Sequence, residues 1–270
     1  MSNKKGLIIY APEDVEKNRT FIEMCSDYLR ERKNELEPVV LDNKNQERLE
    51  RDLTDVDFVI NRSRNSSIAR QFEEQGIRVF NSAYVTEVGN DKWKTYELAV
   101  RNSIPVMKTE KVPLFEKELN YPLVLKSRDG HGGSEVFLVH DKEEYDTYVR
   151  RIGNRGIIQP VADSKGRDVR AYVIGGKVVV AICRQAGDGF KSNFSLGGDV
   201  SVYELGKEEL EIVNQVVRIL KPDYAGIDIM WDGDRVILNE IEDAVGARMV
   251  YATSNINIVG RYIDYICQQL

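Results

Sequence analysis

The stretch GIDIMWDGDRVILNEIE, residues 226–242, decides the fold prediction. Two apolar runs, residues 225–231 and 235–242, flank the turn sequence Asp232-Gly233-Asp234, which predicts a β-hairpin with a three-residue loop. Both runs carry apolar residues on both faces, as buried strands do. We therefore expect a buried hairpin near the end of the chain.

Three acids interrupt these apolar strands. The loop length places Asp228 opposite Leu238, and period-two alternation then puts Asp228, Glu240 and Glu242 on one face. Three buried acids repel one another unless they are neutralised, and a hard divalent cation with bound phosphate does this, so Mg²⁺ or Mn²⁺ is implied. The alternative is that the strand ends splay, which leaves Glu242 and Asp243 in water.

A second hairpin precedes this one. Residues 168–174 and 177–184 flank two glycines, and they carry Arg170 and Arg184. Arginine suits forked contacts with carboxylate or phosphate, but structural ion pairs explain both residues equally well. The following loop, residues 188–198, is either part of a substrate site or a plain surface loop.

A glycine-rich segment, Gly130-His131-Gly132-Gly133-Ser134, lies between two predicted strands, residues 122–127 and 136–140. The pattern and helix of a P-loop are missing, so we interpret the segment as a mobile flap whose backbone N–H groups can cover phosphates. A flexible surface hairpin is the alternative.

Two lysines stand at unusual positions. Lys126 ends an otherwise apolar strand where the flap begins, and a half-buried ammonium usually has an anionic partner, such as phosphate. Lys92 lies in the first turn of a predicted helix, where the helix dipole disfavours a cation. The alternative for Lys92 is a solvated lysine on an exposed face.

The first part of the chain has a different pattern. From residue 6 to about residue 81, short β-rich segments alternate with helical ones such as residues 15–32 and 67–75, as in a small parallel α/β domain. Its first strand is not followed by GxGxxG, so a dinucleotide site is not indicated there. A helix is expected from residue 90 or 91 to about residue 102, followed by a small α+β region, and residues 208–220 and 256–269 are expected to form amphipathic helices.

Composition excludes several classes of protein. The 270 residues carry a formal net charge of -6 with both signs mixed, which disfavours nucleic-acid binding. The longest apolar run, residues 178–183, is far shorter than the roughly 18 residues of a membrane span. The three cysteines are scattered, which suggests neither disulfides nor zinc and fits a reducing cytoplasm, and the two histidines leave little for a catalytic triad.

Taken in order, these segments resemble the ATP-grasp superfamily, and within it the RimK-like carboxylate-amine ligases. The order of the segments carries the resemblance. The matching segments are Ile60-Asn61-Arg62-Ser63-Arg64, Asn90-Asp91-Lys92, residues 104–109, residues 122–126 with the flap, Asp168-Val169-Arg170, Ser192-Asn193 with Gly197-Gly198, Gly226-Ile227-Asp228 and Asn239-Glu240-Ile241-Glu242.

The resemblance implies a fold and its division. The fold class is α/β plus α+β, an ATP-grasp fold with a small parallel α/β domain before it. Residues 1–90 would form the N-terminal domain, residues 91–156 the linker helix and lid subdomain with the flap, and residues 157–270 the C-terminal subdomain with the metal site.

The resemblance also implies a role for each candidate residue. Lys92 and Lys126 would hold the ATP phosphates beneath the flap of Gly130, His131, Gly132, Gly133 and Ser134, with adenine beside Gln159, Pro160 and Val161. Asp228, Glu240 and Glu242 would hold the metals. Arg170, Arg184 and Asn193 would face the transferred phosphate and the acyl group.

The implied activity is ATP-dependent joining of a carboxylate to an amine through an acyl phosphate, with release of ADP and phosphate. The substrates would be small molecules or peptides, and a homo-oligomer fits the resemblance. The alternatives are an ATP-grasp kinase acting on a small-molecule hydroxyl and a non-catalytic nucleotide-binding module.

The sequence departs from the family pattern in four places. Glu242 stands where the family usually has asparagine, and Leu196 replaces an arginine that is frequent in glutamate ligases. Asp243-Ala244-Val245-Gly246 replaces a Ser-Ser-Pro-Gly turn, and Pro160 replaces a commonly acidic residue. These changes put an acidic amino-acid substrate in doubt and leave the nucleotide preference open.

Overall fold

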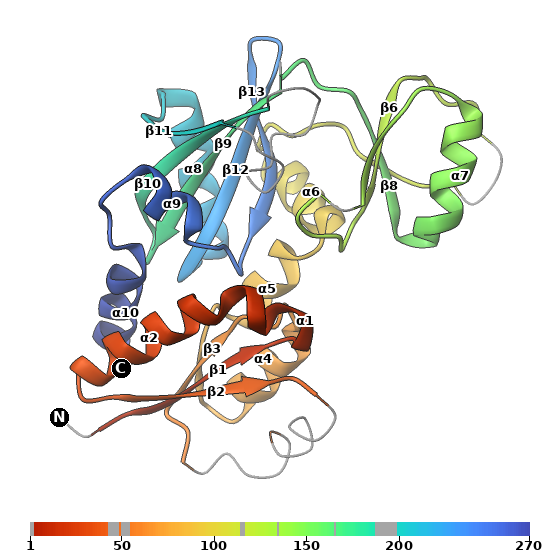
Figure 1. Ribbon diagram of the computed structural model, residues 1–270. Coiled ribbons are helices and arrows are strands. Elements are labelled where there is room, and N and C mark those ends of the chain that lie inside the picture. Colours follow the sequence, from red (N-terminus) through yellow and green to blue (C-terminus); the bar gives the residue numbers. More distant parts are fainter. Residues whose placement is uncertain are drawn as a thin grey trace.

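The structure is a computed structural model that describes residues 3–42, 49, 55–113, 117–133, 135–164, 166–186 and 199–270. Three sheets and their covering helices make up this part of the chain (Figure 1). The first sheet is parallel and the other two are antiparallel, so the predicted α/β plus α+β class is confirmed.

The first sheet has the strand order β2-β1-β3-β4. Its strands are β1 (Lys5–Tyr10), β2 (Glu35–Val40), β3 (Phe58–Asn61) and β4 (Arg78–Phe80). Residues 6–10 of the central strand β1 are all buried, because helices cover both faces of a parallel sheet. Helix α2 (Arg19–Glu31) packs on the face of Ile8, and α4 (Ser66–Glu74) packs on the face of Leu7.

The expected helix over residues 15–32 is interrupted. Helix α1 (Pro12–Val15) and the 3₁₀ turn η1 (Glu16–Asn18) precede α2. The Asn18 side chain donates a hydrogen bond of 2.7 Å to the carbonyl of Asp14, and such side-chain bonds compete with regular helix. The sequence prediction also missed α5 (Ala83–Gly89), which Ser82 caps. The predicted helix after it is α6 (Lys92–Arg101), capped by Asp91.

The second sheet has the order β5-β8-β6-β7. Its strands are β5 (Glu110–Lys111), β6 (Leu123–Ser127), β7 (Val136–Val139) and β8 (Gly156–Pro160), and α7 (Lys142–Ile152) and the turn η2 (Gly153–Arg155) join β7 to β8. Because β8 pairs with β6, this sheet continues to Pro160, past the predicted boundary at residue 156.

The third sheet has the order β11-β10-β9-β12-β13. Its strands are β9 (Arg167–Ile174), β10 (Lys177–Gln185), β11 (Asp199–Tyr203), β12 (Tyr224–Asp232) and β13 (Arg235–Glu242). Helix α8 (Lys207–Leu220) packs on one face, while α9 (Arg248–Thr253) and α10 (Ile258–Gln269) lie on the other. The sequence prediction missed β11 and α9, and the expected loop over residues 188–198 lies outside the described residues.

The predicted register of the last hairpin is wrong. Asp232 pairs with Arg235, so the loop contains only Gly233 and Asp234. Gly233 has φ of 64°, which suits the tight turn. A β-bulge between Asp228 and Ile229 then shifts the pairing, and Asp228 lies opposite Glu240 rather than Leu238.

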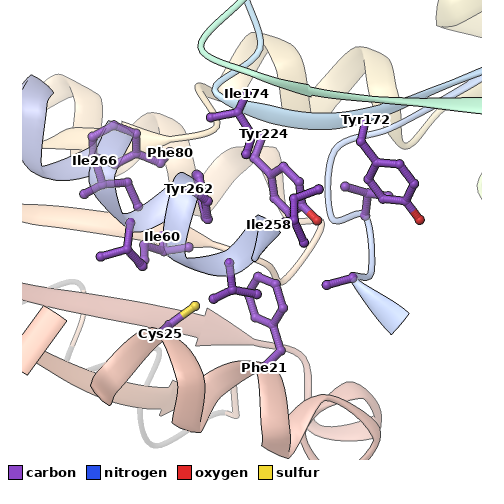
Figure 2. Close-up of a cluster of buried hydrophobic side chains, with 14 of the residues drawn as sticks. Phe21, Cys25, Ile60, Phe80, Tyr172, Ile174, Tyr224, Ile258, Tyr262 and Ile266 are labelled. Carbon is purple, nitrogen blue, oxygen red and sulfur yellow. The ribbon is translucent and has the colours of Figure 1, made fainter. Parts of the chain in front are cut away.

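A shared core joins the first and third sheets. Figure 2 shows Phe21 and Cys25 of α2 in one cluster with Tyr224 of β12 and with Tyr262 and Ile266 of α10. Each of these side chains is at most 7% exposed. The N-terminal sheet is therefore packed against the sheet that carries the acids.

The buried guanidinium of Arg62 crosses the same interface. It donates to the carbonyls of Ala244 (3.0 Å) and Val245 (2.9 Å), and its carbon lies 4.4 Å from the centroid of the Phe21 ring. Arg62 follows β3, while Ala244 and Val245 form the turn after β13. One side chain thus fastens that turn to the N-terminal sheet.

Cys25, Cys183 and Cys267 are all free thiols. Within the described residues, no helix has both the length and the apolar character needed to cross a bilayer.

Candidate active site

The acids of the last hairpin lie close together. Asp228 is opposite Glu240, and Glu242 is opposite Gly226, so the three carboxylates do share one face. One oxygen from each lies within 4.8 Å of the others. The alternative of splayed, solvated strand ends is wrong, because the side chain of Glu242 is only 30% exposed and Asp243 is 2% exposed.

Arg170 binds two of these acids. It lies on β9 directly opposite Asp228 and is 7% exposed. Its Nε and Nη2 atoms each donate to Asp228 at 2.7 Å, while Nη1 and Nη2 donate to Glu242 at 2.6 and 2.8 Å. One guanidinium therefore clamps both carboxylates through forked hydrogen bonds.

Arg184 extends this network along the sheet. It lies on β10 opposite Asp168, and its Nε donates to Asp168 at 2.8 Å. Its Nη2 also donates to Asp228 at 2.6 Å. Asp228 thus accepts from two buried arginines, and the structural ion pairs considered for Arg170 and Arg184 are present.

The arginines control the charge of the acids. Burial raises the pKa of Asp228, but Arg170 and Arg184 outweigh that effect and hold the pKa at about 2. Burial dominates at Glu242, and its pKa is raised despite Arg170. Protein cations therefore offset much of the charge of these acids in the ligand-free structure, whereas the sequence analysis assigned that role to a divalent cation with bound phosphate.

Lys92 neutralises the third acid and touches the flap. Its Nζ lies 2.9 Å from Glu240 and donates to the carbonyl of Gly130 at 2.5 Å. Burial raises the pKa of Glu240, but the attraction of Lys92 leaves it below its ordinary value. The alternative that Lys92 is a solvated surface residue is wrong, since its side chain is only 12% exposed.

Lys126 is different. Its position on β6 faces the same acids, yet its amine has no hydrogen bond or ion pair with any described residue. Burial lowers its pKa to about 8, although the more distant charge of Glu240 opposes this shift. An ammonium held this way is ready to accept an anionic partner.

The flap follows Lys126. Gly132 and Gly133 have φ of 63° and 74°, a conformation that side chains disfavour. At its base, Arg155 reaches Asp129 at 2.6 Å and Glu135 at 3.3 Å, so the base is held by ion pairs while the tip consists largely of glycine. Ser134 lies outside the described residues.

The strand proposed to lie beside adenine borders the same space. Gln159 donates to the Thr109 hydroxyl at 2.8 Å, which orients its amide. Val161 just beyond β8 is 39% exposed, and such an apolar surface suits a planar base.

A first cavity brings most of the candidate residues together. Its lining contains Lys92, Lys126, Gly130, Gly132, Gly133, Gln159, Pro160, Val161, Arg170, Arg184, Asp228, Glu240 and Glu242. The sequence analysis missed Asp168 and Asn239, which also line it, although both stand in segments that carry the resemblance. Asn193 lies outside the described residues.

His131 faces a second cavity instead. This cavity has a volume of about 310 Å³ and shares Gly132, Arg170, Arg184 and Glu242 with the first. The sequence analysis assigned no role to its remaining polar lining: Lys17, Asn18, Arg64, Asn90 and Arg248. Most of these residues come from segments distant in the chain, and only folding brings them together.

The residues of the first cavity suit a magnesium nucleotide. Carboxylate oxygens are the ligands that hard divalent cations prefer, and three of them converge here. Lys126 offers a half-buried cation for phosphate. The donor set therefore fits both groups, provided that Arg170 releases part of its hold on Asp228 and Glu242.

Sequence comparisons agree with this geometry. A family model for the RimK-like ATP-grasp domain matches residues 89–266. An uncharacterized protein of Mycoplasma genitalium is 30% identical over 96% of this chain and 91% of its own length. A probable alpha-L-glutamate ligase of Parasynechococcus marenigrum is 31% identical over 76% of this chain, but this covers only 46% of the ligase.

Solved structures show the same fold. D-alanine–D-alanine ligase from Bacillus anthracis, complexed with ATP, superposes with a TM-score of 0.74 at 18% identity. The match covers 98% of this chain and 96% of that ligase. The ATP-grasp fold with a parallel α/β domain before it is thereby confirmed.

Proposed function

The chain belongs to the RimK-like ATP-grasp family, and from this premise we propose that it uses ATP to join a carboxylate to an amine. The glutamate ligase and the D-alanine–D-alanine ligase among its relatives and structural neighbours support this reaction class. The products would be an amide, ADP and phosphate.

The position of Lys126 carries the proposal. Its amine lacks a partner among the described residues, and it borders the same cavity as the acidic face. Phosphates of ATP would supply the missing anion, and Lys92, which already holds Glu240 and Gly130, lies beside them. Phosphoryl transfer depends mainly on such positioning and charge neutralisation.

The flap explains how this site opens and closes. The first cavity has a volume of about 150 Å³, below the roughly 300 Å³ of ordinary small-molecule sites. The contact between Lys92 and the Gly130 carbonyl holds the flap over the cavity. The flap must therefore open to admit nucleotide, and its closure would exclude water.

The proposed reaction class implies the following chemistry. An oxygen of the substrate carboxylate attacks the γ-phosphorus of ATP, and the bond from that phosphorus to the bridging oxygen of ADP breaks. The amine then attacks the acyl carbon, loses a proton, and displaces phosphate. Arg170 and Arg184 border both cavities, where they would orient the carboxylate and stabilise the charge that develops on its oxygens.

Three acids would hold magnesium. Asp228, Glu240 and Glu242 supply oxygen ligands for Mg²⁺ or Mn²⁺, which neutralises phosphate charge when it is bound. Adenine would lie beside Gln159 and Val161. The free thiols fit the predicted cytoplasmic location.

An acyl-phosphate trap tests this proposal. Purified protein is incubated with ATP, Mg²⁺ and a panel of carboxylic acids, with hydroxylamine as the amine. We expect ADP release and formation of hydroxamates, which mass spectrometry identifies. A stable phosphorylated hydroxyl compound without phosphate release would instead indicate a kinase, and nucleotide binding without ADP formation would indicate a binding module.

A further inference from the structure

The second cavity is rich in positive charge. Among the described residues, its lining contains Lys17, Arg64, Arg170, Arg184 and Arg248 and a single carboxylate, that of Glu242. A substrate that carries an ammonium would be repelled here, whereas an anion would be attracted.

The cations divide into two groups. Arg170 and Arg184 lie at the wall shared with the first cavity, where the acids of the third sheet balance them. Lys17, Arg64 and Arg248 form the other group, which we name the distal cations.

A buried acid orients two distal cations. Asp14 is 2% exposed and forms ion pairs with both Lys17 and Arg64. Burial opposes its ionisation, but these two cations leave its pKa below the ordinary value. Asp14 is therefore a positioning residue that holds Lys17 and Arg64 at the cavity.

Arg248 completes the group without a partner. Its exposed side chain forms no hydrogen bond or ion pair within the described part of the chain. The three distal cations face the single carboxylate of Asp14, which leaves an excess of two positive charges among these described residues. Nothing in the proposed ligation of a simple carboxylic acid uses this excess.

We propose that the second cavity binds the carboxylate substrate and selects acids with a second anionic group, which Lys17, Arg64 and Arg248 hold. The reacting carboxylate would lie at the shared wall by Arg170 and Arg184, with the second anion at the distal end. This inference rests on the proposed ligase function and specifies its substrate class.

The test compares diacids with their uncharged equivalents. Succinate, glutarate and adipate are each assayed beside the corresponding monoamide, which has nearly the same shape but one anionic group fewer. ADP release and hydroxamate formation are followed as above. We expect kcat/KM to be at least about tenfold higher for the preferred diacid, because a charge-assisted hydrogen bond is lost with the amide.

Variants locate the effect. Arg248→Gln removes an unpaired exposed cation, so folding should be unaffected, and we expect the KM for the preferred diacid to rise about tenfold. The KM for its monoamide should change less than about twofold. Arg218→Gln, on the outer face of α8, is the matched control and should leave both constants unchanged.

The two failures can be told apart. If monoamides react as well as diacids, the selection for a second anion is refuted, while the ligase function stands. If no acid releases ADP, the ligase function fails, and calorimetry with glutarate still decides the cavity: binding that Arg248→Gln weakens supports it, and absence of binding refutes it. A phosphonate analogue of the preferred diacid shows whether the second group is a carboxylate or a phosphate.

Discussion

Two regions of buried charge meet at the first cavity, and they are built differently. On the third sheet, Asp228 and Glu242 are clamped by Arg170, so positive and negative groups satisfy one another. On the second sheet, Lys126 has no such partner among the described residues. The first region is neutralised by its own side chains, whereas the second leaves a cation that the proposed phosphate would pair.

The difference indicates what each region contributes. A paired cluster keeps its geometry without ligand, which preorganises the acids and arginines for reaction. An unpaired cation within the fold lowers the free energy of unfolding of the ligand-free protein, and pairing with an anion favours binding of that anion. If ATP binds as proposed, this contrast predicts that the second sheet, which also carries the flap, responds to it more than the third sheet.

The largest effect should come from breaking the paired region. Arg170→Met leaves the buried Asp228 and the half-buried Glu242 without their main partner, and we expect the free energy of unfolding to fall by about 3–5 kcal/mol. Chemical denaturation of the ligand-free protein measures this. Adding Glu242→Gln should recover part of the loss, and an unchanged midpoint in the single variant would contradict the clamp.

A smaller effect is expected on turnover. Glu240→Gln removes a proposed metal ligand while Asp228 keeps its arginines, and ADP release should fall about 10²–10³-fold. Mn²⁺ affinity, measured by electron paramagnetic resonance, should fall as well. Asp228→Asn should lower turnover at least as much, and near-normal activity of both variants at limiting magnesium would refute their assignment as metal ligands.

Removing the charge of Lys126 should raise stability, whereas Arg170→Met should lower it. Lys126→Met is expected to stabilise the ligand-free protein at pH 7 by about 1–3 kcal/mol and to weaken ATP binding.

The pH dependence of this gain has a defined sign. The pKa of Lys126 is about 8 in the folded protein against an ordinary 10.5, so between these values the unfolded chain binds more protons. Wild-type stability should therefore gain from this group as pH rises from about 8 to 10.5, and the advantage of methionine should disappear. Thermal unfolding of both proteins across this pH range checks the prediction, and a constant difference would contradict it.

The smallest effect should come from an exposed pair. Lys142 and Asp146 lie 3.2 Å apart on α7, with side chains 64% and 45% exposed. Lys142→Gln should change the free energy of unfolding by at most about 0.5 kcal/mol, because water and salt screen such pairs. If chemical denaturation showed a larger loss of stability for Lys142→Gln, burial would not explain why exposed and buried ion pairs differ in strength.

Local sequence pattern predicted the elements better than their pairing. The apolar runs around Asp228 and Glu240 identified both strands because period-two alternation is a local property. The two-residue loop and the bulge beside Asp228 were both missed because the register of a hairpin also depends on packing against neighbouring strands such as β9, which is not a local property of the sequence. The acids nevertheless share a face, since the shorter loop and the bulge each shift the pairing by one residue and a total shift of two leaves the face unchanged.

The candidate site was predicted in part for a similar reason. Lys126 and Arg170 stood out because charge within an apolar strand is visible in the sequence. Lys17 and Arg248 did not, because a charged residue in a polar segment looks like any solvated side chain. Lys17 lies in η1 and Arg248 begins α9, and the shared core of the first and third sheets brings these elements to one cavity.

Arg62 has a consequence for how the enzyme moves. Because it ties the turn of Ala244 and Val245 to the N-terminal sheet, the walls that would cradle the acid substrate form one rigid block. Opening and closing of the proposed nucleotide site would then be movements of the second sheet relative to this fixed block. An acid could thus remain seated while spent nucleotide is exchanged.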